Sequence, residues 1–150
     1  MGKFTDKGRR IACTNRKARH DYSLIETFEA GLVLEGSEVK SLRNGGGALT
    51  DAYGEIRDGE VFLVNAHIAG YSSASYNDHE PRRRRKLLLH AREIRRIEQR
   101  SREKGYTLVP LSIYFKHGLA KVELALARGR KTYDKRERIM RRDLARAGVE

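Results

Sequence analysis

Hydrophobic and polar residues alternate along several short segments of the chain, which is the pattern of half-buried β-strands. Asp58-Gly59 and Lys116-His117-Gly118 each stand between two alternating segments, and these turns predict two hairpins. We expect strands within residues 22–28, 32–34, 48–56, 61–68, 106–116 and 119–127, with breaks at Gly31 and Gly36.

A short helix is expected between the first strands and the next group. Ser37 is a suitable N-cap for a helix over residues 38–43, whose apolar side chains share one face. Lys40 and Arg43 then share another face. The helix would end at Asn44-Gly45-Gly46-Gly47, which we interpret as a stop signal and a flexible loop, because the triple glycine lacks the flanking residues of a nucleotide-binding loop.

A second helix is expected at residues 90–104. His90, Ile94 and Ile97 lie on one of its faces, arginines lie on the opposite face, and Gly105 stops it. Many short strands with few helical crossovers favour an antiparallel arrangement over a parallel sheet. We therefore predict a mainly β fold, an OB-fold-like small antiparallel β-barrel with flanking helices.

Charge is distributed in blocks. The chain has 150 residues and a net charge of +12, which argues for a polyanionic partner, with nucleic acid as the leading candidate. Residues 1–20 carry seven basic and one acidic side chain (+6), residues 21–78 three and ten (−7), and residues 79–104 eleven and four (+7). Residues 128–150 carry nine basic and four acidic side chains (+5). Contact with nucleic acid is therefore expected on particular faces.

The two ends of the chain lack the pattern of a core. Residues 1–14 are expected to form a flexible basic N-terminal arm, and residues 15–127 the globular body. Residues 128–150 have too little apolar surface to offset the entropy of ordering, so we predict a basic C-terminal tail that is disordered in isolation. One apolar stripe would form if the tail became helical, from Ile139, Met140, Leu144 and Ala147.

Candidate catalytic chemistry is sparse. The five histidines are dispersed without metal-ligand spacing, and the single cysteine, Cys13, permits no intramolecular disulfide. We expect no metal, no cofactor and no membrane span, and a cytoplasmic location. A binding module is favoured over an enzyme. One enzymatic alternative stays open, an RNA nuclease whose metal site would use carboxylates such as Glu26, Glu38, Asp51 and Glu55.

A run of five adjacent cations occupies residues 82–86. Such cations repel one another unless an anion lies against them, and RNA phosphates would supply it. Tyrosines elsewhere in the body offer rings on which bases stack. The additional basic RNA contacts expected here are Arg82, Arg83, Arg84, Arg85 and Lys86.

Several segments in this order resemble the SmpB family of SsrA-binding proteins. They are Asn15-Arg16-Lys17-Ala18, Tyr22, residues 26–31 (ETFEAG), 36–43 (GSEVKSLR), 65–68 (NAHI), 85–89 (RKLLL), 108–111 (LVPL) and Asp134-Lys135-Arg136. The resemblance spans residues 13 to about 143. It implies an OB-like body that binds the tRNA-like domain of tmRNA, and no enzymatic activity.

The resemblance also implies residue roles and partners. Contacts with tmRNA would come from Asn15, Arg16, Lys17, Tyr22, Glu26, Glu38, Lys40 and Arg43. Either glutamate would order an arginine or accept a hydrogen bond from the RNA. The tail would fold as a helix in the empty mRNA channel of the stalled ribosome and contact the decoding centre through Gly129, Arg130, Lys131, Tyr133, Asp134, Lys135 and Arg136.

In this family the partners are tmRNA and the small-subunit rRNA of the stalled ribosome. Elongation factor Tu and alanyl-tRNA synthetase follow indirectly through tmRNA, and neither a membrane nor DNA is expected. The nascent chain would be tagged and the ribosome rescued. The competing binding function is a general RNA-binding OB protein without the tagging role.

Overall fold

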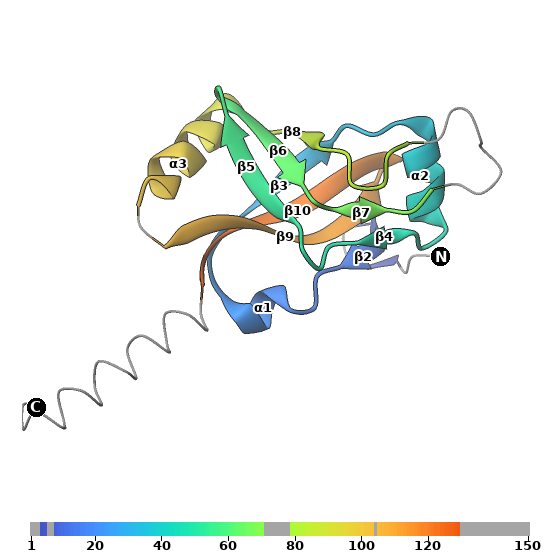
Figure 1. Cartoon of the computed structure of the whole chain (residues 1–150), viewed down its shortest axis with the longest axis horizontal. Coiled ribbons are helices and arrows are strands. Elements are labelled where there is room, and N and C mark those ends of the chain that lie inside the picture. Colours follow the sequence, from blue (N-terminus) through green and yellow to red (C-terminus); the bar gives the residue numbers. More distant parts are fainter. Residues whose placement is uncertain (1–3, 6–7, 71–78, 104, 130–150) are drawn as a thin grey trace, which may run out of the picture.

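The computed structural model describes residues 4–5, 8–70, 79–103 and 105–129. Its strands are β1 (Phe4–Thr5), β2 (Arg9–Thr14), β3 (Tyr22–Leu32), β4 (Gly47–Ala48), β5 (Tyr53–Arg57), β6 (Glu60–Val64), β7 (His67–Ile68), β8 (Arg85–Leu88), β9 (Tyr106–Lys116) and β10 (Leu119–Gly129). The helices are α1 (Ala18–Asp21), α2 (Gly36–Arg43) and α3 (Ala91–Ser101). The mainly β prediction is confirmed (Figure 1).

One antiparallel sheet runs in the order β1-β2-β9-β10-β3-β8-β6-β5, and β4 and β7 form a separate pair. Strand β5, the last in this order, also pairs with β9 through Gly54 and Leu108. This pairing closes six strands, β9-β10-β3-β8-β6-β5, into a small barrel. The closure removes the free edges that a flat sheet would expose.

The barrel interior holds the main core. Residues from facing strands, such as Leu63, Leu87, Ile113 and Leu124, are fully buried there, and Ile97 of α3 joins them. A smaller cluster lies on the outer side of β9 and β10, where Ala18 of α1 packs against alanine and aliphatic side chains from these strands. The small cluster holds α1 against the sheet and so positions the polar residues beside it.

The two predicted hairpins are confirmed. β5 and β6 turn at Asp58 and Gly59, with φ of 52° and 75°, and β9 and β10 turn at His117 and Gly118, with φ of 53° and 77°. Positive φ at both turn residues is the geometry whose twist matches antiparallel strands.

The first strand of the barrel is longer than predicted. The sequence indicated two short strands broken at Gly31, whereas β3 runs without interruption from Tyr22 to Leu32. Gly31 stays in the ladder between Lys121 and Leu88. A β-carbon there would lie 3.3 Å from that of Leu88, so the glycine permits close strand approach and is not a break.

The predicted flexible arm at residues 1–14 is wrong for its second half. Residues 9–14 form β2, which pairs with β9 from Arg9↔Lys116 to Thr14↔Ser112. Arg9 fixes this strand further, because its guanidinium lies 4.5 Å from the Tyr114 ring centre and contacts Glu29 at 3.6 Å. The sequence of this segment begins with two arginines, so it lacks the clear alternation of apolar and polar residues that predicts a strand.

Helix α2 begins earlier than predicted. Its N-cap is Glu35, whose backbone N–H donates to the Glu38 carboxylate at 2.8 Å in a capping box. Ser37, the predicted cap, lies within the helix and its hydroxyl is 2.8 Å from the His79 ring nitrogen Nδ1. The predicted stop at Asn44 is confirmed.

The triple glycine after α2 serves close packing. Gly46 donates its backbone N–H to the carbonyl of Ser41 at 2.8 Å, and a β-carbon on Gly46 would collide with the Ser41 hydroxyl oxygen. We predicted that these glycines provide a flexible loop. In the structure they instead allow the chain to turn tightly against the end of α2.

Helix α3 ends at Ser101, three residues before the predicted end and well before Gly105. His90 is its N-cap and not part of the apolar face that was predicted. At the other end of the body, β10 continues through Gly129, two residues past the predicted strand end at Ala127. No helix in the described segments is long and apolar enough to cross a membrane.

Candidate nucleic-acid interface

A cleft of about 230 Å³ lies beside α1, where the chain enters β3. Its lining includes Asn15, Lys17 and Tyr22 from the α1 side and Asp51 and Tyr53 from the segment before β5. The structure therefore brings three of the predicted RNA-binding residues together. Arg16 is exposed next to them.

The side chain of Asn15 is already engaged. Its amide donates to the carbonyl of Pro110 at 3.0 Å, and its backbone N–H donates to the carbonyl of Leu111 at 2.7 Å. Both bonds tie the turn before α1 to β9. Asn15 thus positions the cleft, while Lys17 supplies its cation and the rings of Tyr22 and Tyr53 supply stacking surfaces.

Tyr53 is one of the tyrosines that the sequence offered for stacking on bases, although it was not among the residues assigned to tmRNA contact. It is 43% exposed although it belongs to a barrel strand, so much of its side chain faces solvent next to the cleft. The alternation of β5 shows it on the outward side, but only the fold places it across from Tyr22 and Lys17.

Lys40 and Arg43 share α2, as their spacing predicted, and both are exposed. The Arg43 guanidinium lies 4.6 Å from the Phe115 ring centre, so part of its cationic face is used within the protein. Helix α2 packs near β2, and Gly47 after the helix lies close to Cys13. Burial raises the pKa of that thiol to about 11, so Cys13 is a protonated packing residue.

Glu38 is fully buried and does not reach the surface of α2. It receives the Arg83 guanidinium at 2.6 Å and makes a short contact with Arg85, which is equally buried. Burial disfavours the carboxylate, but these hydrogen bonds and that from the Glu35 backbone hold the pKa of Glu38 below its ordinary value of 4.5. Two roles were considered for Glu38, and in the structure it orders two arginines, Arg83 and Arg85.

Arg85 was predicted as an RNA contact, and this prediction is wrong for the described conformation. The residue points into the body because β8 alternates buried and exposed positions. Its guanidinium donates to the carbonyls of Ala66 at 2.9 Å and Pro81 at 3.1 Å in addition to Glu38. Burial lowers the pKa of Arg85, and Glu38 opposes this effect.

The other cations of the run also have partners within the protein. Arg82 donates to Asn65, Arg84 lies 3.5 Å from Glu55, and Lys86 lies 3.5 Å from Glu60. The predicted repulsion is therefore relieved by carboxylates and carbonyls of the same chain. Phosphate is not needed to hold these side chains side by side.

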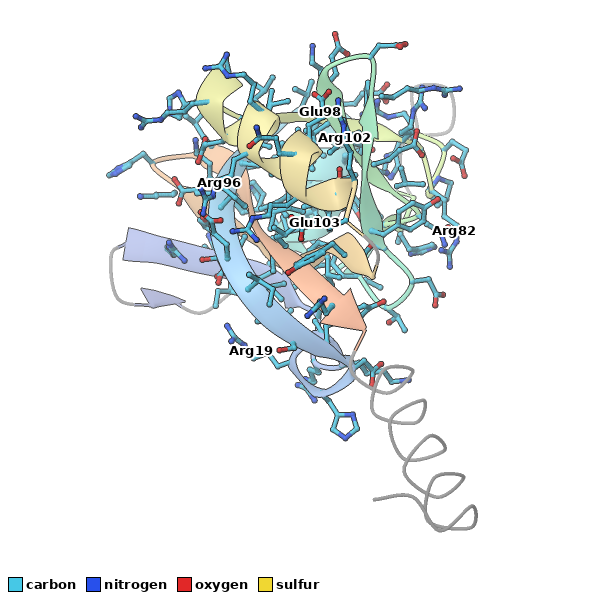
Figure 2. All side chains as sticks on the ribbon, turned by 90° about the vertical axis from the view of Figure 1, so that its left-hand side faces the viewer. Arg19, Arg82, Arg96, Glu98, Arg102 and Glu103 are labelled. Carbon is cyan, nitrogen blue, oxygen red and sulfur yellow. The ribbon has the colours of Figure 1, made fainter. Side chains whose placement is uncertain are left out.

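Glu26 lies on β3 and accepts a hydrogen bond from the Arg96 side chain at 2.6 Å. Figure 2 shows Arg96 reaching from α3 toward β3. Glu26 orders an arginine here, one of the two roles considered for it. It lies away from the α1 cleft and from α2, so the predicted contacts occupy three separate places.

The carboxylates of the nuclease alternative do not converge. Glu26, Glu38 and Glu55 lie on β3, α2 and β5, and each pairs with an arginine. Within the described part of the chain, no group of three or more histidine, cysteine, aspartate or glutamate residues is arranged to hold a metal ion.

Gly129 is the last residue that the structure describes, at the end of β10. The other predicted decoding-centre contacts, from Arg130 to Arg136, lie outside the described residues. The same is true of the apolar stripe predicted for the tail.

Comparisons with known proteins agree over nearly the whole chain. A family model described as SmpB protein matches residues 12–149. The SsrA-binding protein of Acidothermus cellulolyticus is 57% identical over 146 residues, which cover 95% of this chain and 92% of the relative. That of Mycobacterium tuberculosis is 56% identical over 146 residues, with 97% and 91% covered.

A solved structure described as "tmRNA-SmpB: a journey to the center of the bacterial ribosome" contains a similar chain. It is 53% identical and superimposes with a TM-score of 0.68, over 79% of this chain and 84% of that chain.

Proposed function

This chain belongs to the SmpB family, and from that premise we propose that it is the tmRNA-binding protein of trans-translation in its cell. It binds the tRNA-like domain of tmRNA and delivers that RNA to stalled ribosomes. The observation that carries the proposal is 57% identity to an SsrA-binding protein across 95% of the chain. The likeness to a chain from a tmRNA–SmpB ribosome structure supports both partners.

The body contributes the RNA grip. Lys17 and Arg16 beside the α1 cleft, with Lys40 and Arg43 on α2, attract the phosphate backbone. Tyr22 offers a ring to an unpaired base in the tRNA-like fold. Three further residues support this grip indirectly, because their side chains already bond other parts of the protein: Asn15, Glu26 and Glu38.

The tail carries the second half of the function. The residues after β10 enter the empty mRNA channel and fold there against rRNA phosphates, and the segment from Gly129, the last residue of β10, to Arg136 lies at the decoding centre. The RNA is accepted without a codon, translation resumes on it, and the nascent chain is tagged. Elongation factor Tu and alanyl-tRNA synthetase act on tmRNA and are indirect partners. The protein works in the cytoplasm as a binding protein without a cofactor or a chemical step of its own.

The test separates the body from the tail. The full chain and a variant lacking residues 131–150 are titrated into labelled tRNA-like domain RNA, with an unrelated tRNA as the competitor. Both proteins should bind the tRNA-like domain with similar affinity and prefer it to the tRNA. Only the full chain should support peptide tagging on ribosomes stalled at the end of a truncated mRNA.

Two results would contradict the proposal. Equal affinity for the competitor tRNA would indicate a general RNA-binding protein. Tagging by the truncated variant at the wild-type level would remove the role assigned to the tail.

A further inference from the structure

One strand edge of the barrel stays uncovered, because β3 is longer than its neighbour β8. Strand β10 pairs with β3 from Tyr22 to Gly31, whereas the pairing of β8 with β3 in the described residues is confined to Gly31 and Leu32. Successive residues of a strand direct their N–H and C=O groups to opposite sides. Alternate residues within 22–30 therefore point these groups away from β10, to a side where the described part of the chain supplies no strand.

Helix α3 lies across from this edge and leaves a cleft of about 580 Å³ between helix and strand. The cleft is lined from both sides, by Glu26, Thr27 and Phe28 of β3 and by Arg92, Glu93, Arg95, Arg96 and Gln99 of α3. Ile97 is fully buried and fixes the other face of the helix against the core.

The contact that spans the cleft joins side chains. Arg96 Nε donates to the Glu26 carboxylate at 2.6 Å, and Figure 2 shows Arg96 on the side of α3 next to β3. Among the described residues, no hydrogen bond joins α3 to the backbone of residues 26–30. The edge of β3 is therefore available to another backbone, and an uncovered edge is a template for strand addition.

The charge left over in this cleft is positive. Its two carboxylates are engaged, because Glu26 pairs with Arg96 and Glu93 accepts the backbone N–H of His90 at 3.0 Å. Arg92 and Arg95 are exposed, and no described residue forms a hydrogen bond or ion pair with either guanidinium. A ligand of the cleft should therefore be acidic.

The strand edge favours a peptide as this ligand. A peptide supplies N–H and C=O groups at the spacing of a β-ladder, whereas a phosphodiester backbone has no N–H groups and would also face the carboxylates of the lining. The two ends of this chain do not match the cleft, since residues 1–20 carry a charge of +6 and residues 128–150 a charge of +5. The matching ligand is an acidic segment of another protein.

We propose, independently of the proposed function, that the cleft between β3 and α3 binds an extended acidic segment of a partner protein, which adds to the edge of β3 as a further strand. Main-chain hydrogen bonds to residues 26–30 supply affinity, and side chains at alternate positions supply specificity. Side chains on one face of a strand repeat every ~6.6 Å, and Arg92 and Arg95 are ~4.5 Å apart along the helix axis. Two carboxylates at alternate positions can thus reach both guanidinium groups and accept paired, charge-assisted hydrogen bonds.

Glu26 competes with the incoming carboxylates. Its ion pair with Arg96 crosses the same cleft, and both side chains are partly exposed, so the pair is weak and can be exchanged for one with the ligand. Glu26→Gln frees Arg96 and removes a negative charge that repels the acidic segment. This variant should bind an acidic peptide about two- to fivefold more tightly than the wild type does.

Fluorescence polarisation tests the proposal with the full-length protein and a labelled heptapeptide, Val-Asp-Val-Asp-Val-Asp-Val. The wild type should bind it about tenfold more tightly than Arg92→Gln/Arg95→Gln does, because the variant loses charge-assisted hydrogen bonds. The control Arg84→Gln/Lys86→Gln removes two charges from the neighbouring basic run, and its affinity should stay within about twofold of the wild type. A peptide with lysine in place of aspartate should not bind.

Three results would overturn the proposal. The first is no binding of the aspartate peptide to the wild type, and the second is an equal loss of affinity in the control variant, which would indicate attraction by net charge alone. The third is binding of a labelled heptanucleotide RNA, sensitive to Arg92→Gln/Arg95→Gln, without binding of the peptide, which would make the cleft a nucleic-acid site. Arg92→Lys/Arg95→Lys should recover part of the peptide affinity, and thermal unfolding of each variant checks that it is folded.

Hydrogen exchange of the backbone amides tests the added strand directly. Bound peptide should slow the exchange of alternate amides within residues 26–30, because the amides between them already bond β10. A peptide held by the arginines alone would leave all of these amides at their free rates, and this outcome would contradict strand addition. No RNA is needed in the peptide measurements, so they decide on the cleft even if the protein fails to prefer tmRNA.

Discussion

At the scale of single residues, the buried Glu38 connects helix α2 to the start of strand β8. It links the helix to Arg83 and Arg85, which flank and begin β8, across 45 and 47 residues of sequence. A buried ion pair is weak as a source of net stability, but removing one partner leaves a charge without compensation in the interior. Its value here is positional, because it fixes the helix that carries Lys40 and Arg43.

We predict that Arg85→Met lowers the free energy of unfolding by about 3 kcal/mol, the lower end of the usual cost of breaking a buried ion pair, because Arg83 still pairs with Glu38. Lys86→Met is the matched control on the same strand, because Lys86 is exposed and its pairing with Glu60 at the surface is worth at most about 1 kcal/mol. Urea unfolding followed by circular dichroism compares the two. Similar decreases would show that the buried contacts of Arg85 are not what stabilises β8.

A second prediction concerns acid. The folded pKa of Glu38 lies below 4.5, so the stability from its ionisation is complete above pH 4.5 and disappears as the pH falls toward the folded value. Glu38→Gln cannot titrate and should show a shallower decrease of unfolding free energy in that acid range. Urea titrations at a series of pH values measure this, and parallel curves for variant and wild type would contradict it.

The pairing of Glu38 with Arg85 also marks a limit of sequence reasoning. Five adjacent cations at 82–86 look like a solvated face, and only strand alternation hints that Arg85 turns inward. Nothing near residue 85 in the sequence indicates its carboxylate partner, because that partner is 47 residues away. The predicted helix face of Lys40 and Arg43 needed only local spacing, and it was found.

At the scale of elements, the barrel closes where Gly54 of β5 meets Leu108 of β9. A β-carbon on Gly54 would lie 2.7 Å from the Leu108 β-carbon, closer than real contacts allow. The glycine is therefore required by the approach of the two strands. This contact lies next to Tyr53, so the closure also fixes one wall of the α1 cleft.

Gly54→Ala should destabilise the fold by about 1 to 3 kcal/mol, the typical cost of overpacking a tightly packed contact. The control is Gly36→Ala at the start of α2, where a β-carbon would meet nothing within 4 Å. That change should be neutral or slightly stabilising, because alanine favours helix. Thermal unfolding of both variants measures the difference. An unchanged unfolding temperature for Gly54→Ala would argue against close contact between β5 and β9.

The elements that local patterns define were predicted well. Asp58-Gly59 and His117-Gly118 adopt the positive φ that hairpin turns require, and both hairpins formed at these residues. Strand β2 was missed because its ladder partner β9 lies about 100 residues further along the chain, beyond any local pattern. Gly31 was misread for the same reason, since its neighbour Leu88 comes from a distant strand.

At the scale of the whole molecule, helices α2 and α3 lie at opposite ends of the barrel (Figure 1). Their electrostatic contributions to RNA affinity should then be nearly independent, because sites far apart with no shared partners act additively. The charge blocks in the sequence indicated separate faces. They did not reveal that carboxylates of other segments pair with Arg83, Arg84, Arg85 and Lys86 within the protein.

We predict that combining Lys40→Ala with Arg92→Gln/Arg95→Gln changes the binding free energy for a ribosome–tmRNA complex by the sum of the separate changes, within about 0.5 kcal/mol. Competition binding at fixed salt measures all three proteins against the wild type. A combined effect far from the sum would mean that one continuous RNA surface covers both places.

Strand β10 ends at Gly129, where the basic C-terminal segment begins, and it is held on both sides along its length by β3 and β9. A pull on the chain end along this strand would load both ladders in shear, so many hydrogen bonds would have to break together before the strand could slide. The barrel should therefore resist force applied at the end of β10. Such a force should be transmitted to the RNA-binding faces before it unfolds the body.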